Sequence, residues 1–505
     1  MRSLPRSGVL LLAGALLAAG CSAGSTPSPG AAAPDSPDAP LRIGFTAEPA
    51  NLDFTRTDGA AIPEALLVNV YEGLVELDQA TGEIVPALAE SWTVSPDGLV
   101  YDFTLREGVT FSNGEPFTAD DVKFSIERVQ SDAWTISLKN GMDVVSGVEV
   151  VSPTQVRVTL SRPSNNWLFS MTTRIGAMFD PSGVADLANT PVGTGPYTVA
   201  EFRRGDRLVL TRRDDYWGEP PAIPRIELQY FRDATAAVNA LLTDGIDVIG
   251  TVQAPEALAQ FDGDDRFQVI EGTTNGEVTL AMNNASGPTS DVRVRRAIAM
   301  AIDHQAVLDT AWAGRGATID TMVPPTAPWY EPMPDVTPYD PEAARALLAA
   351  AGMPNPSLRM RIANLPYAVA AAQVVQSQLA AVGIRTEIEP LEFPARWLEE
   401  VFRGADYDLS IVSHVEPRDI RTFGDPDYYW RYDNPEVQRL LAESEAGGPE
   451  QQVASLRQVG RIIAEDAAAD WLFVLPNLIV ADADVRGLPQ NRIGESFDVT
   501  ALSRG

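Results

Sequence analysis

The order of apolar and polar residues predicts strands at several places in the first half of the chain. Leu41 to Phe45 is typical of a first strand. Tyr101, Phe103 and Leu105 alternate with polar neighbours, which is typical of a strand with one buried face. The stretch from Val144 to Leu160 alternates in the same way and predicts further strands.

Helical spacing occurs in the same region. Apolar residues at helical spacing within Leu66 to Leu77 predict a helix that Gly73 ends. A second helix is expected after Thr118, whose side chain caps it, with Asp120 and Asp121 in the first turn near the positive end of the helix dipole. The position of these two acids therefore has a structural explanation.

The segment from Gly193 to Ile249 is predicted to be rich in strands. Asp233 is placed to cap its helix, and Gly245 ends that helix. The expected elements are the strands Tyr197 to Phe202, Leu208 to Arg212, Arg225 to Phe231 and Asp247 to Ile249, and the helix Ala234 to Leu242.

Strands and helices alternate from Val278 onward, and Asp340, Pro341 and Gly352 mark the start and stop of one helix. The expected strands are Val278 to Met282, Arg359 to Ala363, Ile384 to Ile388 and Tyr407 to Val412. The expected helices include Val292 to Ile302, Ala368 to Val382, Pro394 to Phe402 and Leu456 to Ala468. Such alternation favours an α/β lobe.

The first residues have the layout of a signal peptide. Arg2 and Arg6 precede the apolar stretch Val9 to Ala19, which has eleven residues. A membrane span needs about 20 apolar residues, so this stretch is too short to cross a bilayer. Residues 1–20 are therefore interpreted as a signal peptide for export.

The apolar stretch ends in Leu17-Ala18-Ala19-Gly20-Cys21, which resembles a lipobox, the motif in which a cysteine receives a lipid. Cys21 is the only cysteine, so it has no partner for an internal disulfide. The alternative is an ordinary secretory peptide with an incidental cysteine. Residues 21–40 are rich in Pro, Ser, Ala and Gly, which predicts a lipidated, flexible tether on the extracytoplasmic side of the cell membrane.

Length and charge narrow the class of protein. About 465 residues follow the tether, enough for two or three domains. The formal net charge of −31 argues against a nucleic-acid partner, because phosphates bind basic patches. After the signal peptide, no segment is apolar over the length that a membrane helix needs.

A series of short motifs runs in one order along the body of the chain. They are Tyr71-Glu72-Gly73-Leu74, Pro86-Ala87-Leu88-Ala89-Glu90-Ser91-Trp92, Asp97-Gly98, Phe111-Ser112-Asn113-Gly114, Phe117-Thr118-Ala119-Asp120-Asp121-Val122, Gly193-Thr194-Gly195-Pro196-Tyr197, Asp215-Tyr216-Trp217 and Val292-Arg293-Val294-Arg295-Arg296-Ala297. Together they resemble the peptide/oligopeptide/nickel class of ABC-importer solute-binding proteins, extracellular solute-binding protein family 5.

The resemblance implies an α/β, two-lobed periplasmic-binding-protein-like fold of type II that closes on a ligand. Residues 41–277 would form the first lobe, with an inserted subdomain at about 60–185; residues 278–475 would form the second lobe, and 476–505 would return to the first. It also implies a monomeric receptor for a peptide or other small solute. This receptor would work with an ABC permease and ATPase, would have no cofactor and would not be an enzyme.

In the peptide-binding relatives, an aspartate in a loop after a second-lobe strand receives the amine of the ligand. The corresponding strand here is Asp408 to Val412, and the anchor position falls on Pro417 or its neighbour. Glu416 and Asp419 are the available substitutes, because a buried amine needs a carboxylate partner. The alternative is that both acids are solvated loop charges. Because this loop departs from the anchoring pattern of the peptide-binding relatives, the class of solute stays open.

Five further residues are candidate ligand contacts on the basis of the resemblance. Glu48 matches an acidic residue of the oligopeptide receptors that approaches the ligand backbone. Phe393 lies where relatives often place a tryptophan, and His414 replaces an aromatic residue. Tyr429 and Trp430 belong to an aromatic cluster that forms either core or pocket wall.

Two other functions compete with the peptide receptor. One is an extracytoplasmic hydrolase, but the chain has no HExxH, CxxC, GxSxG or Walker motif. The other keeps the fold and binds a sugar, an opine, a metal chelate or another solute, or acts as a sensor. Because His304 and His414 are the only histidines, no metal ligands are assigned, and nickel coordination by the protein alone is not expected.

Overall fold

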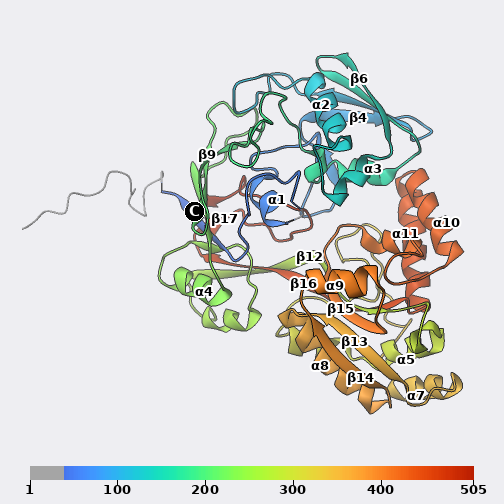
Figure 1. Ribbon diagram of the computed structural model, residues 1–505. Coiled ribbons are helices and arrows are strands. Elements are labelled where there is room, and N and C mark those ends of the chain that lie inside the picture. The colour runs from blue at the N-terminus through green and yellow to red at the C-terminus, as the bar shows by residue number, and fades with distance from the viewer. Residues whose placement is uncertain (1–38, 58) are drawn as a thin grey trace, which may run out of the picture. The chain divides into compact units, whose positions relative to one another are not determined.

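The computed structural model of the protein describes residues 39–57 and 59–505 (Figure 1). Pro40–Gly505 forms one compact unit. The predicted signal peptide, Cys21 and nearly all of the predicted tether lie outside the described residues. Among the helices that are described, none combines the length and the apolar character needed to cross a bilayer.

A ten-stranded sheet with the order β14-β13-β15-β12-β16-β11-β1-β10-β9-β8 runs through this unit. Parallel pairs such as β1–β10 and β13–β14 occur beside antiparallel pairs, so the sheet is mixed. The strands are β14 Arg385–Leu391, β13 Ser357–Ala363, β15 Leu409–His414, β12 Phe267–Met282, β16 Ala469–Asp482, β11 Val248–Ile249, β1 Leu41–Phe45, β10 Arg225–Tyr230, β9 Arg207–Arg212 and β8 Tyr197–Arg203.

β12 and β16 are the longest of these strands, and they lie antiparallel in the middle of the sheet. Their ladder shifts register between Thr273 and Glu277, so that residues 274–276 of β12 face Leu475 of β16 alone. Such extra residues disrupt a ladder locally and bend the strand that carries them. Both positions predicted for the crossings between lobes lie within these two strands.

A separate antiparallel sheet has the order β4-β5-β7-β6. Its strands are β4 Ala89–Val94, β5 Val100–Leu105, β7 Gln155–Leu160 and β6 Val145–Ser152. Helix α2, Ala119–Gln130, packs on it. The Thr118 backbone N–H donates a hydrogen bond of 2.7 Å to Asp121 Oδ2, and the two residues form a capping box, so the predicted helix start is confirmed.

The remaining elements are short strands and helices. Two small sheets pair β2 Val75–Leu77 with β3 Ile84–Pro86, and β17 Val485–Arg486 with β18 Ser503–Arg504. The other α-helices are α1 Ala61–Leu66, α3 Asn165–Ser170, α4 Ala234–Leu242, α5 Val292–Met300, α6 His304–Ala311, α7 Pro341–Ala350, α8 Pro366–Ala381, α9 Ala395–Trp397, α10 Pro435–Ala446 and α11 Pro449–Glu465. The 3₁₀-helices are η1 Ser137–Met142, η2 Arg174–Gly176, η3 Pro255–Gln260, η4 Pro288–Ser290 and η6 Asp419–Gly424, and η5 Leu398–Arg403 is a π-helix.

The helix predicted within Leu66 to Leu77 is wrong. Helix α1 ends at Leu66, Val68 has a φ of 69°, and strand β2 begins at Val75. Most apolar residues of this segment are buried in the largest core, whichever way their side chains point. The spacing of the apolar residues therefore reflects their burial in the core and does not mark one face of a helix.

The buried apolar residues form several cores. The largest joins β1, β5, α2, β9 and β10. Two others consist of residues between Val278 and Val474, on the helices and strands that follow β12. The acidic residues described next lie where β15 ends beside the middle of β12, next to one of these later cores.

Candidate functional site

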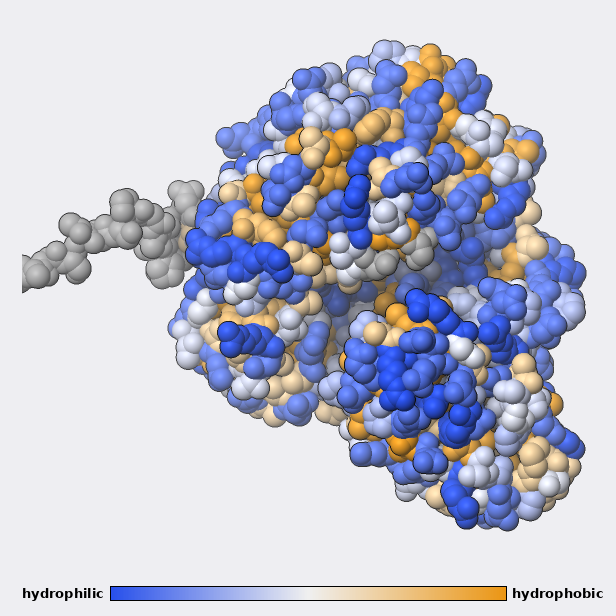
Figure 2. Space-filling model, viewed as in Figure 1, coloured by the Kyte–Doolittle hydropathy of each residue, from blue (hydrophilic) through white to orange (hydrophobic). Residues whose placement is uncertain are grey.

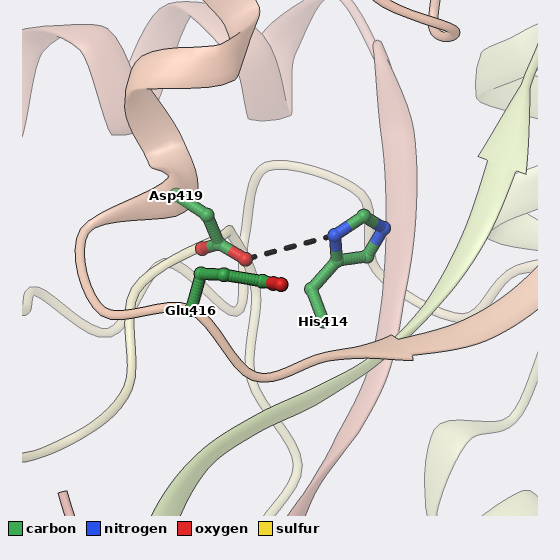
Figure 3. A group of neighbouring side chains, drawn as sticks. All are labelled: His414, Glu416 and Asp419. Carbon is green, nitrogen blue, oxygen red and sulfur yellow. Dashed lines mark ion pairs between the residues drawn. The ribbon is translucent and has the colours of Figure 1, made fainter. Parts of the chain in front are cut away.

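Strand β15 and helical turn η6 bring three polar side chains together. His414 is the last residue of β15, Glu416 lies in the loop that follows, and Asp419 begins η6. The three side chains point toward one another (Figure 3). One ligand atom from each lies within 4.8 Å of the other two, and His414 Nδ1 lies 3.7 Å from Asp419 Oδ2.

Glu277 of β12 adds a fourth polar group to this site. It pairs with His414 across the β12–β15 ladder, so the two side chains share one face of the sheet. Glu277 is 1% exposed. Glu277 Oε2 and Asp419 Oδ2 are both buried and have no hydrogen-bond partner among the described residues. We call Glu277, His414, Glu416 and Asp419 the acidic cluster.

The electrostatics of the acidic cluster favour a positive ligand. Burial raises the pKa of the Glu277 carboxyl well above its ordinary value, and the neighbouring Asp419 and Glu416 raise it further. Burial, followed by the charge of Glu416, raises the pKa of Asp419 in the same way. A cation beside these carboxyls stabilises their charged form, which is costly in buried surroundings without a partner.

Aromatic neighbours hold His414 in place. Its Nε2 lies 2.8 Å from the Tyr429 hydroxyl, and its ring centre lies 4.9 Å from that of Trp430. Burial lowers the pKa of His414 to about 3, so the imidazole is neutral near pH 7. The approach to Asp419 therefore joins a neutral ring to a carboxyl group and is not an ion pair.

A cavity of ≈ 480 Å³ adjoins the acidic cluster. Asp419 and Arg418 line it together with apolar residues that include Phe169, Trp329 and Ile493. This volume includes space that is open to solvent. Polar residues cover most of the face shown in Figure 2, and this face is hollowed beside the position of α9.

Arg418 places a positive charge next to the same cavity. Its guanidinium carbon lies 4.0 Å from the centre of the Phe169 ring and 5.3 Å from that of Trp329. Burial lowers the pKa of Arg418 to about 10, so the side chain is still charged at neutral pH. The wall of the cavity thus carries one half-buried cation beside the buried carboxyl of Asp419.

Helices α3 and α10 are in contact near this cavity. Ser164 Oγ donates a hydrogen bond of 2.7 Å to Glu445 Oε2, and the Asn166 backbone N–H donates one of 3.2 Å to the same oxygen. Asn165 Nδ2 donates to the Ser444 carbonyl at 2.8 Å. These bonds join an element that precedes β12 in the chain to one that follows β15.

Two of the candidate residues lie apart from the acidic cluster. Glu48 Oε1 accepts a hydrogen bond of 2.7 Å from the backbone N–H of Gly205. Phe393 is 38% exposed, and its ring packs against Trp397 with centres 5.9 Å apart. Neither residue lines the cavity.

Tyr429 and Trp430 are 1% and 0% exposed and belong to an apolar core. They do not line the cavity, and they reach the acidic cluster through His414. Tyr429 and Trp430 therefore support the imidazole ring of His414.

Glu277, Arg418 and Glu445 were not among the site residues predicted from the sequence. The strand predicted from Val278 to Met282 began one residue too late to include Glu277. Glu277 could have been recognised as an acid at the start of the apolar run Val278 to Met282. A carboxylate in a buried strand is uncommon without a partner, so it indicates a site.

Residues 83–441 match the family model described as bacterial extracellular solute-binding proteins, family 5 Middle. The chain belongs to this family. The predicted family is thereby confirmed, and the acidic cluster lies within the matched region.

Relatives in this family bear names that refer to different solutes. The chain is 30% identical over 424 residues to di/tripeptide-binding protein 2 of Pseudomonas aeruginosa, with 77% of either chain covered. It is 32% identical over 302 residues to the nickel-binding periplasmic protein of Escherichia coli, covering 57% of this chain and 56% of that one.

Solved structures resemble this family 5 protein over most of its length. HbpA2 from Haemophilus parasuis superimposes with a TM-score of 0.82 at 23% identity, covering 92% of this chain and 99% of that one. The Helicobacter pylori protein DppA in complex with the peptide STSA gives 0.77 at 22% identity, covering 92% and 98%. These likenesses confirm the predicted α/β, two-lobed binding-protein fold.

Family 5 consists of extracellular solute-binding proteins that bind peptides or small ligands and work with an ABC permease. The prediction of a receptor and not an enzyme is therefore confirmed. The varied names of the relatives leave the solute of this chain to be argued from its own residues.

Proposed function

We propose that this protein is a lipid-anchored receptor that captures a peptide or peptide-like solute and delivers it to an ABC permease. The solute would bind between a first lobe of residues 41–277 and a second lobe of 278–475, with 476–505 returning to the first. The observation that carries the proposal is the acidic cluster, whose member Asp419 lines a cavity together with Arg418.

The charges around the cavity support a solute that carries both signs. Asp419 has a buried, unpartnered oxygen for a positive group. Arg418 offers a half-buried guanidinium for a carboxylate, for which its planar donors are well suited. A short peptide has one group of each sign at its ends, which is why we favour this class over a neutral sugar.

Mass spectrometry of solutes that co-purify with the protein tests this proposal. We expect a short peptide or a peptide-like zwitterion at about one equivalent, and we expect it to raise the melting temperature of the stripped protein. Calorimetry with that solute should give one site without turnover. Recovery of a neutral sugar, or steady hydrolysis of the peptide, would contradict the proposal.

Lipid attachment is tested by Cys21→Ser. We expect nearly all of the variant to move from the membrane fraction to the soluble fraction, because the proposed acyl chains supply the binding energy for the bilayer. Fractionation and labelling with an alkyne fatty acid measure the change, with Ser22→Ala as the matched control. Equal membrane recovery of wild type and Cys21→Ser would show that Cys21 is not the anchor.

We predict that the contact between α3 and α10 slows the release of solute, so that a variant lacking it releases the solute faster. Glu445→Ala removes an acceptor that two groups of α3 share. If this contact forms when the lobes close, we expect the dissociation rate to rise about 10-fold, since bonds to a charged group contribute about 1.5–3 kcal/mol. Stopped-flow release measures the rate.

Glu443→Ala is the control for Glu445→Ala, because Glu443 lies on the same helix and pairs with Arg439 at the surface. It should leave the release rate unchanged. Equal rates for both variants would mean that the contact does not contribute to retention of the solute.

A further inference from the structure

We propose that His414, Glu416 and Asp419 bind one divalent first-row transition-metal ion at the wall of the cavity, with Glu277 beside them. The metal ion would be the positive centre to which the solute is attached. Its role in solute capture rests on the proposed function, whereas metal binding by the cluster rests on the side chains themselves.

The cluster offers the donor types that such ions bind. One imidazole nitrogen and two carboxylate oxygens lie within 4.8 Å of one another and converge on one point (Figure 3). Imidazole and carboxylate ligands together suit zinc, cobalt, nickel and iron better than magnesium or calcium, which prefer oxygen alone. Three protein ligands also leave a coordination position open for a solute.

The unpartnered oxygens favour a metal ion over a single ammonium group. Glu277 Oε2 and Asp419 Oδ2 are buried without a hydrogen-bond partner in the described part of the chain, and Glu416 stands beside them. Three carboxylates carry three negative charges when ionised. An ammonium ion compensates one of these charges, whereas a divalent ion compensates two.

The hydrogen bond to Tyr429 prepares His414 as a ligand. When His414 Nε2 donates its hydrogen to the Tyr429 hydroxyl at 2.8 Å, the lone pair lies on Nδ1. Nδ1 is the nitrogen that faces Asp419, at 3.7 Å from Oδ2. Metal-bound histidines commonly use the second ring nitrogen for such an orienting hydrogen bond.

The ligand atoms of His414, Glu416 and Asp419, which lie within 4.8 Å of one another, must move closer together to bind one ion. Around a tetrahedral ion with bonds of about 2.1 Å, ligand atoms lie about 3.4 Å apart. Glu416 is exposed, and its one hydrogen bond to a side-chain oxygen within the described residues comes from the neighbouring Val415 backbone N–H at 3.3 Å. Its side chain is therefore free to swing inward, while β15 and η6 hold His414 and Asp419 in place.

This inference differs from the expectation drawn from the sequence. Two histidines far apart argued against coordination by the protein alone, and His304 indeed pairs with Asp470 elsewhere. The structure supplies what the histidine count could not show, namely that Glu277, Glu416 and Asp419 gather around His414.

The test uses the full-length protein without a histidine tag, stripped of metal with a chelator. Co²⁺, Zn²⁺, Ni²⁺ and Mg²⁺ are titrated singly in a calorimeter, and the Co²⁺ complex is followed by visible absorption. We expect one equivalent of Co²⁺, Zn²⁺ or Ni²⁺ to bind, the cobalt spectrum to show nitrogen and oxygen ligation, and Mg²⁺ to bind at least about 100-fold more weakly.

Variants locate the metal. Asp419→Asn and Glu416→Gln are each expected to raise the Kd for Zn²⁺ at least about 100-fold, because even outer partners of metal ligands contribute about 10–100-fold. Tyr429→Phe should raise it about 10-fold through loss of the orienting bond. Asp427→Asn is the matched control, since its side chain is 96% exposed and belongs to the same segment.

Several results would overturn the metal proposal. They are the absence of a saturable site, a cobalt spectrum unchanged by Asp419→Asn, and equal effects of Glu416→Gln and Asp427→Asn, which would indicate general binding to an acidic surface. Glu416 is exposed, so its variant is expected to fold even if Asp419→Asn does not. A solute that binds the metal-free protein at full affinity would reject the metal but leave the proposed receptor function intact.

Discussion

Asp419→Ala is expected to weaken binding of the solute by about 3–5 kcal/mol, which corresponds to roughly 10²–10³-fold or more in Kd. Asp419 is 7% exposed and lines the cavity, and one of its oxygens has no partner among the described residues. Its removal leaves the positive group of a bound solute without a buried counter-charge. Calorimetry with the co-purified solute measures the loss.

The same substitution is expected to stabilise the free protein. A buried carboxyl without a partner costs stability, so Asp419→Ala should raise the melting temperature of the solute-free and metal-free protein. In the metal-free protein, Glu416→Ala should change the affinity for the solute less, by about 1 kcal/mol, since this side chain is exposed. If both variants bind the solute within error of wild type, neither Asp419 nor Glu416 anchors it.

Trp430→Ala is expected to lower the free energy of unfolding by about 3–5 kcal/mol, the range for truncation of a buried aromatic residue. The Trp430 ring is fully buried, stacks on Phe423 with ring centres 5.0 Å apart, and lies 4.2 Å from the Tyr429 ring. Its Nε1 donates a hydrogen bond of 3.0 Å to Thr422 Oγ1. Urea unfolding followed by circular dichroism measures the change.

Phe393→Ala serves as the control for Trp430→Ala. Phe393 is 38% exposed, so its truncation should cost about 1 kcal/mol or less. Trp430→Phe should lie between the two. If Trp430→Ala weakened binding of the solute without lowering the free energy of unfolding, Trp430 would belong to the pocket wall and not to the core.

Much of the fold could be predicted from local patterns. The alternation of Tyr101, Phe103 and Leu105 predicted β5, and the predicted Thr118 cap is completed by Asp121 at the start of α2. Strand β16 was missed, because Trp471 to Val474 form a continuous apolar run that does not alternate. Such a run is typical of a strand buried on both faces and carries no period to recognise.

The site could be predicted only in part. Glu416 and Asp419 were found because they lie near the anchor position in the chain, and the structure brings them to His414. Glu277 lies more than a hundred residues earlier and reaches them through the pairing of β12 with β15. Long-range strand pairing depends on the whole fold, so no local pattern around Glu277 contains it.

The irregular pairing of β12 and β16 has a consequence for how the family diverges. Residues 274–276 face Leu475 alone, immediately before Glu277. Successive side chains of a strand point to opposite faces, but the β12–β15 ladder begins at Glu277 and holds it opposite His414 whatever the length of this segment. A single-codon insertion or deletion in residues 274–276 would therefore shift Phe267–Thr273 against β16 and alter the bend of β12, while the acidic cluster of a descendant receptor stayed intact.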